Sequence, residues 1–280
     1  MTITTQHIVS YVKQHRCYSH PVFDNWAVAN PAPEVVGALF HQIQNFCAAT
    51  RPGGKFPEAA RAHGMSSVAA LLDEIVESES NHGPQLATMA GYILNRAAGQ
   101  DICKDLGDHT AVEAKLREYS DQLLGSLPGY QSETSLTTQA RKAIAVFERR
   151  NETDRESTFR NIGSALALEI ISNRQLIPGE KHCLVDSGLY GATLDDESMH
   201  YLKEHWGEIG AEQQHEKNAI QAVNNVLNEE TGPFIMEGAR EFLDSLASLW
   251  DLLDSALLQS GHTRRAYGVT RAQSSASASA

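Results

Sequence analysis

The sequence lacks the signals of a protein that binds nucleic acid or crosses a membrane. Only 23 lysines and arginines stand against 35 aspartates and glutamates, so the net charge is −12, which opposes binding to phosphate backbones and anionic lipids. No run approaches the ~20 apolar residues of a membrane helix. The opening residues MTITTQHIVSYVKQH lack the basic and apolar regions of a secretion signal. We therefore expect a cytoplasmic protein with no nucleic-acid or membrane partner.

Cysteine is also scarce. The chain has 4 cysteines, Cys17, Cys47, Cys103 and Cys183, and none of them forms a CxxC pair. This spacing excludes a zinc knuckle and gives no sign of a disulfide framework. We expect reduced thiols that are mostly buried.

Alternating, β-branched runs typical of strands are few, and nearly every segment between turn signals has helical periodicity. The pattern predicts an all-α, single-domain bundle of about eight helices over residues 1–262. The Ser/Ala-rich segment 263–280 has too few apolar groups to offset the entropy of ordering, so we expect a disordered tail there. The predicted helices span residues 33–50, 66–82, 83–100, 109–127, 134–150, 153–176, 201–227 and 232–259.

The stretch 201–226, YLKEHWGEIGAEQQHEKNAIQAVNNV, carries ionisable groups where a helix should be apolar. As one helix it would place Leu202, Ala219 and Val223 on its buried face. The titratable side chains on that stripe are His205, Glu208, Glu212 and His215. Burying them without partners would cost several kcal/mol, so either the first half of the helix is exposed or these groups converge on something that satisfies them.

Two further helices carry acids on apolar faces. Glu169 shares a face with Ile162 and Leu166, although a glutamate at a helix end can also reach solvent. In SSVAALLDEIVESESNH, Glu79 and His82 continue the buried side, and a kink near residue 82 would bring Glu77 or Glu74 to the same side. The simpler interpretation of that segment is a solvated acidic run at a helix end.

Acids and imidazoles from three core-facing helices are typical of a bundle that holds two iron or manganese ions. A mixed set of six or seven Glu and His side chains suits such a site better than zinc, which prefers four ligands. Calcium does not use imidazole.

The motif order resembles the heme-oxygenase-like diiron oxidases, relatives of the pyrroloquinoline quinone synthase and thiaminase-type helical folds. HPVFDNW is followed by the acid/His pair that closes SSVAALLDEIVESESNH, then by ALALEIISN, and then by GLYGATLDDESMHYLKEH before a final His. The resemblance covers roughly residues 15–228. It implies a heme-oxygenase-like bundle with two Fe(II) ions per chain and O2 as co-substrate.

Carried over residue by residue, the resemblance implies that His82 and Glu79 (or Glu77) form the first pair and that Glu169 bridges the ions. The family's last helix carries a His-x3-Asp-x2-His pattern, from which this chain departs. Counted from His205, Ile209 stands where the aspartate should be. Counted from His215, the pattern becomes Glu208-x3-Glu212-x2-His215. The metal ligands implied by the two registers together are Glu79, His82, Glu169, His205, Glu208, Glu212 and His215, with Glu77 as the alternative to Glu79.

The implied activity is oxidation of a small amino acid, amine or fatty-acid-like substrate by a non-heme diiron oxygenase or oxidase, by N-oxygenation, desaturation or C–C cleavage, in natural-product biosynthesis. Arg160 and Arg174 flank Glu169 in the sequence. They are candidate carboxylate anchors, and the simpler interpretation is that each is solvated at the surface. Two alternatives stay open. One is a metal-free member of the fold, a cofactor oxidase or a thiaminase-like hydrolase with Cys47 as nucleophile, and the other is a non-enzymatic helical binding protein. A homodimer is one option for the assembly.

Overall fold

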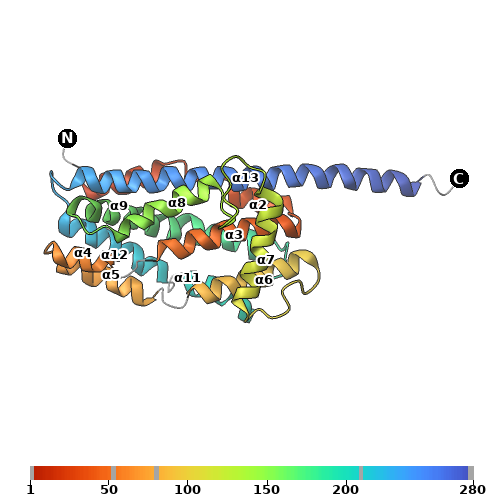
Figure 1. Cartoon of the computed structure of the whole chain (residues 1–280), viewed down its shortest axis with the longest axis horizontal. Helices are drawn as coiled ribbons and strands as arrows, with labels where there is room; N and C mark the ends of the chain where they lie inside the picture. The colour runs from red at the N-terminus through yellow and green to blue at the C-terminus, as the bar shows by residue number, and fades with distance from the viewer. Residues whose placement is uncertain (1–2, 52–54, 79–81, 208–210, 277–280) are drawn as a thin grey trace.

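The structure is a computed structural model that describes residues 3–51, 55–78, 82–207 and 211–276 (Figure 1). These residues contain no strand beyond an isolated bridge between Gln131 and Leu136, which confirms the all-α prediction. The α-helices are α1 (Thr5–Gln14), α2 (Val22–Ala29), α3 (Pro33–Thr50), α4 (Lys55–Ala62), α5 (Ser66–Ser78), α6 (His82–Ala98), α7 (His109–Leu124), α8 (Thr138–Glu148), α9 (Arg155–Ile171), α10 (Ile177–Lys181), α11 (His200–His205), α12 (Ala211–Val226) and α13 (Gly232–Ala276).

The described residues form more helices than the predicted number of about eight. The additional ones are short, and α1, α2 and α4 have at most 10 residues each. Helices of that length show too few turns for an apolar stripe to stand out. Local capping still defines α1, because the Thr4 side chain accepts a hydrogen bond from the His7 amide while the His7 ring accepts one from the Thr4 amide.

Helix α13 runs along the whole bundle and packs against α9, α8 and α2 (Figure 1). On the other side of α9, helix α12 lies between α9 and α5, while α3 contacts α6, α7 and α8. Helix α13 continues to Ala276, through most of the segment for which the sequence predicts a disordered tail. The division into domain and tail stays a prediction.

The centre of the core is aromatic. Phe46 of α3, Phe147 of α8, and Phe242 and Trp250 of α13 lie with ring centroids 5.6–6.4 Å apart. Such rings contribute large apolar areas and favourable edge contacts. Phe46 therefore ties the core to the cavity described below, because it lines both.

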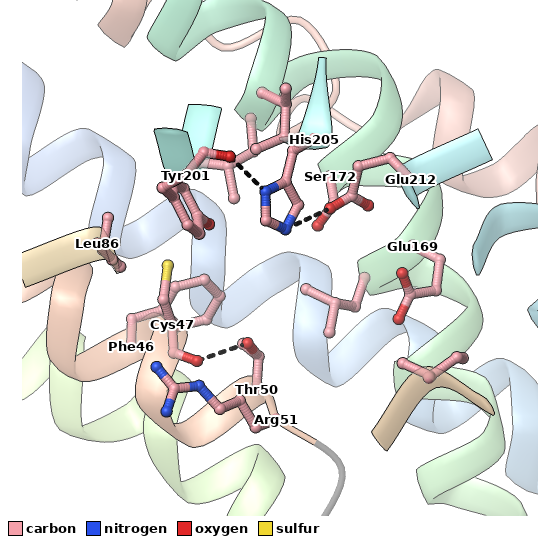
Figure 2. Close-up of a pocket in the computed structure, with 14 residues that line it drawn as sticks. Phe46, Cys47, Thr50, Arg51, Leu86, Glu169, Ser172, Tyr201, His205 and Glu212 are labelled. Atoms are coloured by element: carbon pink, nitrogen blue, oxygen red, sulfur yellow. Dashed lines mark hydrogen bonds and ion pairs between the residues drawn. The ribbon is translucent and has the colours of Figure 1, made fainter. Parts of the chain in front are cut away.

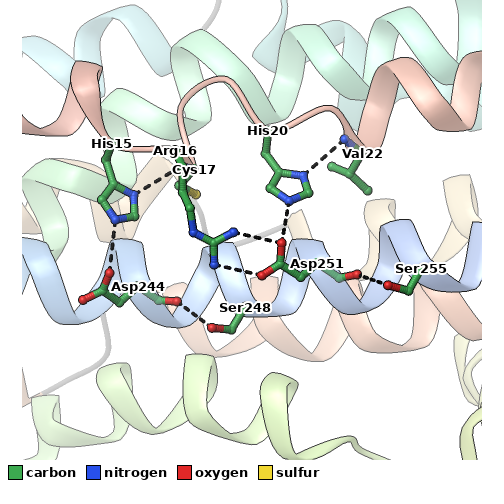
Figure 3. Close-up of polar contacts among 9 residues, drawn as sticks. All are labelled: His15, Arg16, Cys17, His20, Val22, Asp244, Ser248, Asp251 and Ser255. Carbon is green, nitrogen blue, oxygen red and sulfur yellow. Dashed lines mark hydrogen bonds and ion pairs between the residues drawn. The ribbon is translucent and has the colours of Figure 1, made fainter.

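An N-terminal loop is held along α13 by polar contacts (Figure 3). The Arg16 guanidinium donates two hydrogen bonds of 2.8 Å to the Asp251 carboxylate, and the His20 ring lies 3.2 Å from the same group. His15 approaches Asp244 at 3.1 Å. The hydrogen bond from Arg16 lowers the pKa of Asp251. Because Arg16 and Asp251 are half-exposed, this contact positions the loop more than it stabilises the fold.

Two predicted helix boundaries are wrong. The stretch 201–227 is not one helix, because α11 ends at His205 and α12 begins at Ala211. Gly207 adopts a left-handed φ of 98°, which a continuing helix cannot contain. The helix predicted to end at residue 176 instead continues through π-helical turns at Ser172–Leu176 and His182–Asp186, with α10 between them. Pro178 and Gly179 suggest a stop, but Pro178 follows the π-helical turn Ser172–Leu176, where the regular α-helical hydrogen-bond pattern is already interrupted and a missing N–H is tolerated.

In the described part of the chain, no helix combines the length and the apolar character that crossing a bilayer requires.

Helices α9 and α13 approach so closely that their backbones touch. A Cβ atom added at Gly163 would lie 1.9 Å from the carbonyl oxygen of Ile235, and one added at Gly238 would lie 1.9 Å from the carbonyl oxygen of Arg160. The two glycines thus face the opposite helix reciprocally. Only the absence of a side chain at both positions permits this crossing.

We expect Gly163→Ala and Gly238→Ala each to lower the free energy of unfolding by about 2 kcal/mol or more, because the obstructing atoms belong to backbone and cannot rotate away. Helix propensity alone would favour alanine by about 1 kcal/mol. A decrease in the free energy of unfolding would therefore show that the backbone clash outweighs helix propensity. Urea unfolding followed by circular dichroism measures the change. Ser255→Ala, on an exposed part of α13, is the control. Glycine variants as stable as the control would show that the helices can separate without cost.

Candidate metal centre

Three buried side chains from two helices converge beside the core. Glu169 lies near the end of α9, and Glu212 and His215 lie in the first turns of α12. One ligand atom of each lies within 4.8 Å of the others, and His215 Nδ1 is 3.7 Å from Glu169 Oε2. All three are at most 6% exposed. The alternative in which Glu169 reaches solvent is therefore wrong.

These separations fit a shared metal ion. Two ligand atoms that are each about 2.1 Å from one ion lie roughly 3.0 Å apart at a right angle and about 4.2 Å apart on opposite sides. The 3.7 Å distance from His215 to Glu169 falls within that span, and the 4.8 Å limit needs only a small closure. Two carboxylates with one imidazole suit iron or manganese. The residues present therefore fit the metal that the sequence predicts.

His205 stands on the other side of Glu212, as Figure 2 shows, with its Nε2 3.7 Å from Glu212 Oε1. Its Nδ1 lies 2.7 Å from the carbonyl oxygen of Tyr201. A carbonyl can only accept, so Nδ1 carries a proton, and Nε2 is the ring nitrogen directed at Glu212. The Tyr201 ring packs against the imidazole with centroids 4.4 Å apart. The Tyr201 carbonyl and the Tyr201 ring thus fix the orientation of the His205 imidazole, with Nε2 toward Glu212.

Glu212 lies between the two groups, with His205 on one side and the Glu169 and His215 pair on the other. The resulting arrangement has one three-ligand position and an adjacent place bordered by Glu212 and His205. A shared carboxylate between neighbouring positions is the layout of a two-ion centre in helical bundles.

A cavity of about 40 Å³ adjoins these groups. Glu169, His205 and Glu212 form its polar side (Figure 2). Its other walls are largely apolar and include Phe46, Ile75, Leu86, Leu168, Leu176, Ile177 and Tyr201. The volume corresponds to roughly two or three water molecules.

A buried arginine supplies positive charge nearby. Arg150 is 5% exposed, donates to the carbonyl oxygen of Thr50, and lies over the Phe147 ring at 4.6 Å. Burial lowers the pKa of Arg150 to about 10, while the charge of Glu169 opposes that shift. Arg150 therefore compensates part of the carboxylate charge without contacting Glu169 in an ion pair.

The two candidate carboxylate anchors near Glu169 are engaged elsewhere and do not line the cavity. Arg160 pairs with Glu237 at 2.9 Å, and Arg174 pairs with Glu216 at 3.2 Å. Glu216 also accepts a hydrogen bond from Asn173 and is buried, although the sequence places it away from the buried stripe. The difference arises because α12 packs between α9 and α5 and buries two faces.

The remaining predicted ligands are only partly placed. Glu79 and Glu208 lie outside the described residues, and the same holds for the side chain of His82, whose backbone begins α6. Glu77 is exposed near the end of α5 and does not join the three convergent groups. Cys47 of α3, the candidate nucleophile of the metal-free alternative, lines the cavity.

Sequence reasoning missed Glu180, which is 2% exposed on α10. Neither of its carboxylate oxygens has a hydrogen-bond partner among the described residues. Burial raises its pKa to about 7, and the charge of neighbouring His205 opposes the shift. The signal was present, because Ile177, Glu180 and Leu184 follow helical spacing on one apolar face. Pro178 and Gly179 concealed it by suggesting a loop.

No protein-family model matches the chain, and neither the curated proteins nor the solved structures contain a significant match. The assignment to the heme-oxygenase-like family therefore stays a prediction.

We expect Glu180→Gln to stabilise the metal-free protein increasingly as the pH rises. A carboxyl group whose pKa is raised from 4.5 to about 7 by folding favours the folded state below pH 4.5, and this contribution is lost as the pH rises through 7. The stability of the variant relative to wild type should therefore grow between pH 4.5 and pH 8, by roughly 3 kcal/mol at most.

Urea unfolding at several pH values measures the difference. The control is Glu204→Gln, which changes an exposed carboxylate on the adjacent α11. A stability difference between Glu180→Gln and wild type that stays constant with pH would mean that Glu180 does not change its ionisation on folding.

Proposed function

We propose that this protein is a non-heme iron oxygenase or oxidase that uses O2 to oxidise a small molecule. The observation that carries the proposal is the convergence of Glu169, Glu212 and His215 inside the bundle. Buried carboxylates are costly unless cations or hydrogen bonds compensate them, and a divalent metal would do so here. The adjoining cavity gives such an ion access to a small reactant.

Glu169, Glu212 and His215 would hold the first ion. Glu212 and His205 would contribute to a second, together with ligands from the predicted set Glu79, His82 and Glu208. Bound iron would supply the redox chemistry that amino-acid side chains lack. The Glu212-x2-His215 spacing on α12 supports the register counted from His215, while His205 reaches the same place from a separate helix.

The chain itself has three roles in this proposal. The Tyr201 carbonyl accepts a hydrogen bond from Nδ1–H of His205 and so keeps Nε2 directed at Glu212. The apolar wall of the cavity excludes water from the reacting groups. Arg150 offsets part of the charge of Glu169 and thereby permits a carboxylate to stay buried before any metal arrives.

One observation favours a second candidate. Cys47 borders the same cavity as His205 and Glu212, so a thiol and an imidazole share one enclosed space. This is the composition of a thiol hydrolase, in which a base activates a cysteine nucleophile. Such an activity would need no metal and would be abolished by Cys47→Ser.

The test is anaerobic titration of the protein with Fe(II), followed by optical spectra after an O2 pulse. We expect saturable binding of up to two ions per chain and a transient visible band. Glu169→Ala, Glu212→Ala and His215→Ala should each weaken binding at the first position by about 100-fold or more, because each removes a direct ligand. Weaker iron binding in all three variants would identify these residues as ligands of one centre.

The control is Glu204→Ala, an exposed carboxylate on α11 that should leave binding unchanged. His205→Ala and Glu208→Ala then distinguish the registers. The variant that lacks a true ligand of the second position should lose the second ion and keep the first. Wild-type protein that shows no saturable uptake of iron would overturn the proposal, and activity that survives without iron but not in Cys47→Ser would favour the hydrolase.

A further inference from the structure

The cavity beside the proposed metal ligands is small. Its volume of about 40 Å³ accommodates no more than a short chain. A second space, an open groove of about 720 Å³, lies among residues of α3, α6 and α7. Arg51 lines both the cavity and the groove. The Arg51 side chain therefore borders both spaces.

Arg51 follows α3 directly, where it caps the helix, and it is half-buried. Its guanidinium packs on the backbone of Gly83, where an added Cβ would lie 2.4 Å from a terminal nitrogen. In the part of the chain that the structure describes, no carboxylate pairs with Arg51. Figure 2 places it across the cavity from His205 and Glu212.

The neighbouring arginines already have partners. Arg117, which also lines the groove, donates to Ser135 Oγ at 2.9 Å and to the carbonyl oxygens of Ser132 and Glu133. Arg150 donates to the Thr50 carbonyl and packs on aromatic rings. The Glu113 carboxylate in the groove accepts from Gln44. Among the described residues at this junction, Arg51 is therefore the arginine whose hydrogen-bonding capacity is left for a ligand.

We propose that Arg51 binds the carboxylate of a small monocarboxylic substrate and directs its apolar body into the cavity toward Glu169 and Glu212. This inference rests on the proposed function and narrows its substrate class to molecules that carry a carboxylate. A planar guanidinium matches a carboxylate through two parallel hydrogen bonds. The apolar walls that such a body would contact include Phe46, Leu86 and Tyr201.

The charge at the junction selects among ligands. The Arg51 guanidinium balances one negative charge, whereas a phosphate dianion would need a second cation, and the other arginine that lines the groove, Arg117, already donates to Ser135 and two backbone carbonyls. An amine without a carboxylate would meet like charge at Arg51. The geometry thus favours monocarboxylates over phosphates and simple amines.

The experiment measures binding of hexanoate, hexan-1-ol, hexylamine and inorganic phosphate to the metal-free full-length chain by ligand-observed NMR titration. We expect hexanoate to bind more tightly than the other three. Arg51→Met, which keeps the length of the side chain, should weaken hexanoate at least about tenfold, since a charged hydrogen bond is lost. Gly83→Ala should weaken it as well by displacing the guanidinium.

The matched control is Arg117→Met, which removes the same charge from the same groove at a residue already engaged in hydrogen bonds. It should change hexanoate affinity by less than about threefold. Hexan-1-ol or phosphate binding as tightly as hexanoate, no hexanoate binding to wild type, or equal affinities for wild type and Arg51→Met would each overturn the inference.

Iron titration of the same variants separates this inference from the proposed function. Arg51→Met should take up iron like wild type, because Arg51 lies outside the ligand set. Arg51-dependent hexanoate binding to a protein that binds no iron would support the carboxylate site and overturn the metal proposal. Normal iron binding without hexanoate binding would overturn the carboxylate site alone.

Discussion

The burial of two carboxylates beside an imidazole is the constraint on which the arrangement of α9, α11 and α12 depends. Glu169 lies on a helix whose residues from Ser157 to Ile171 are nearly all buried, so its charge cannot reach solvent. The groups that compensate this charge come from separate elements. His215 of α12 lies 3.7 Å from Glu169, and Arg150 is more distant. A site assembled in this way requires that the helices keep their relative positions.

Part of the centre could be predicted from the sequence because helical spacing alone places Glu212 and His215 on one face. Glu169 was likewise recognisable as an acid among small apolar residues. The sequence predicts His205 and Glu212 close together because it places both on one continuous helical stripe. They lie close together in the structure, but they belong to different helices. The break at Gly207 changed the path of the chain without separating the side chains.

Other features could not be predicted because they depend on how helices pack. Periodicity identifies one buried face, but α12 is covered on two, so Glu216 is buried where the sequence predicts exposure. Glu180 was missed because Pro178 and Gly179 usually end helices, whereas here they lie within a helical run between π-helical turns. The ion pairs of Arg160 with Glu237 and of Arg174 with Glu216, and the position of Arg51 beside two cavities, involve partners distant in sequence.

The glycine crossing of α9 and α13 has a consequence for how the site can respond to a ligand. Glu169 follows Gly163 by six residues, which is about 9 Å along the helix axis. The position of this carboxylate is therefore fixed by a contact between two backbones that cannot move closer together. Glu212 and His205, in contrast, lie on either side of an interruption that contains a left-handed glycine. The centre thus has a stationary half and an adjustable half. Any tightening of the 3.7 Å distance between His215 and Glu169 should come from α12 moving toward α9, with Glu169 as the fixed point.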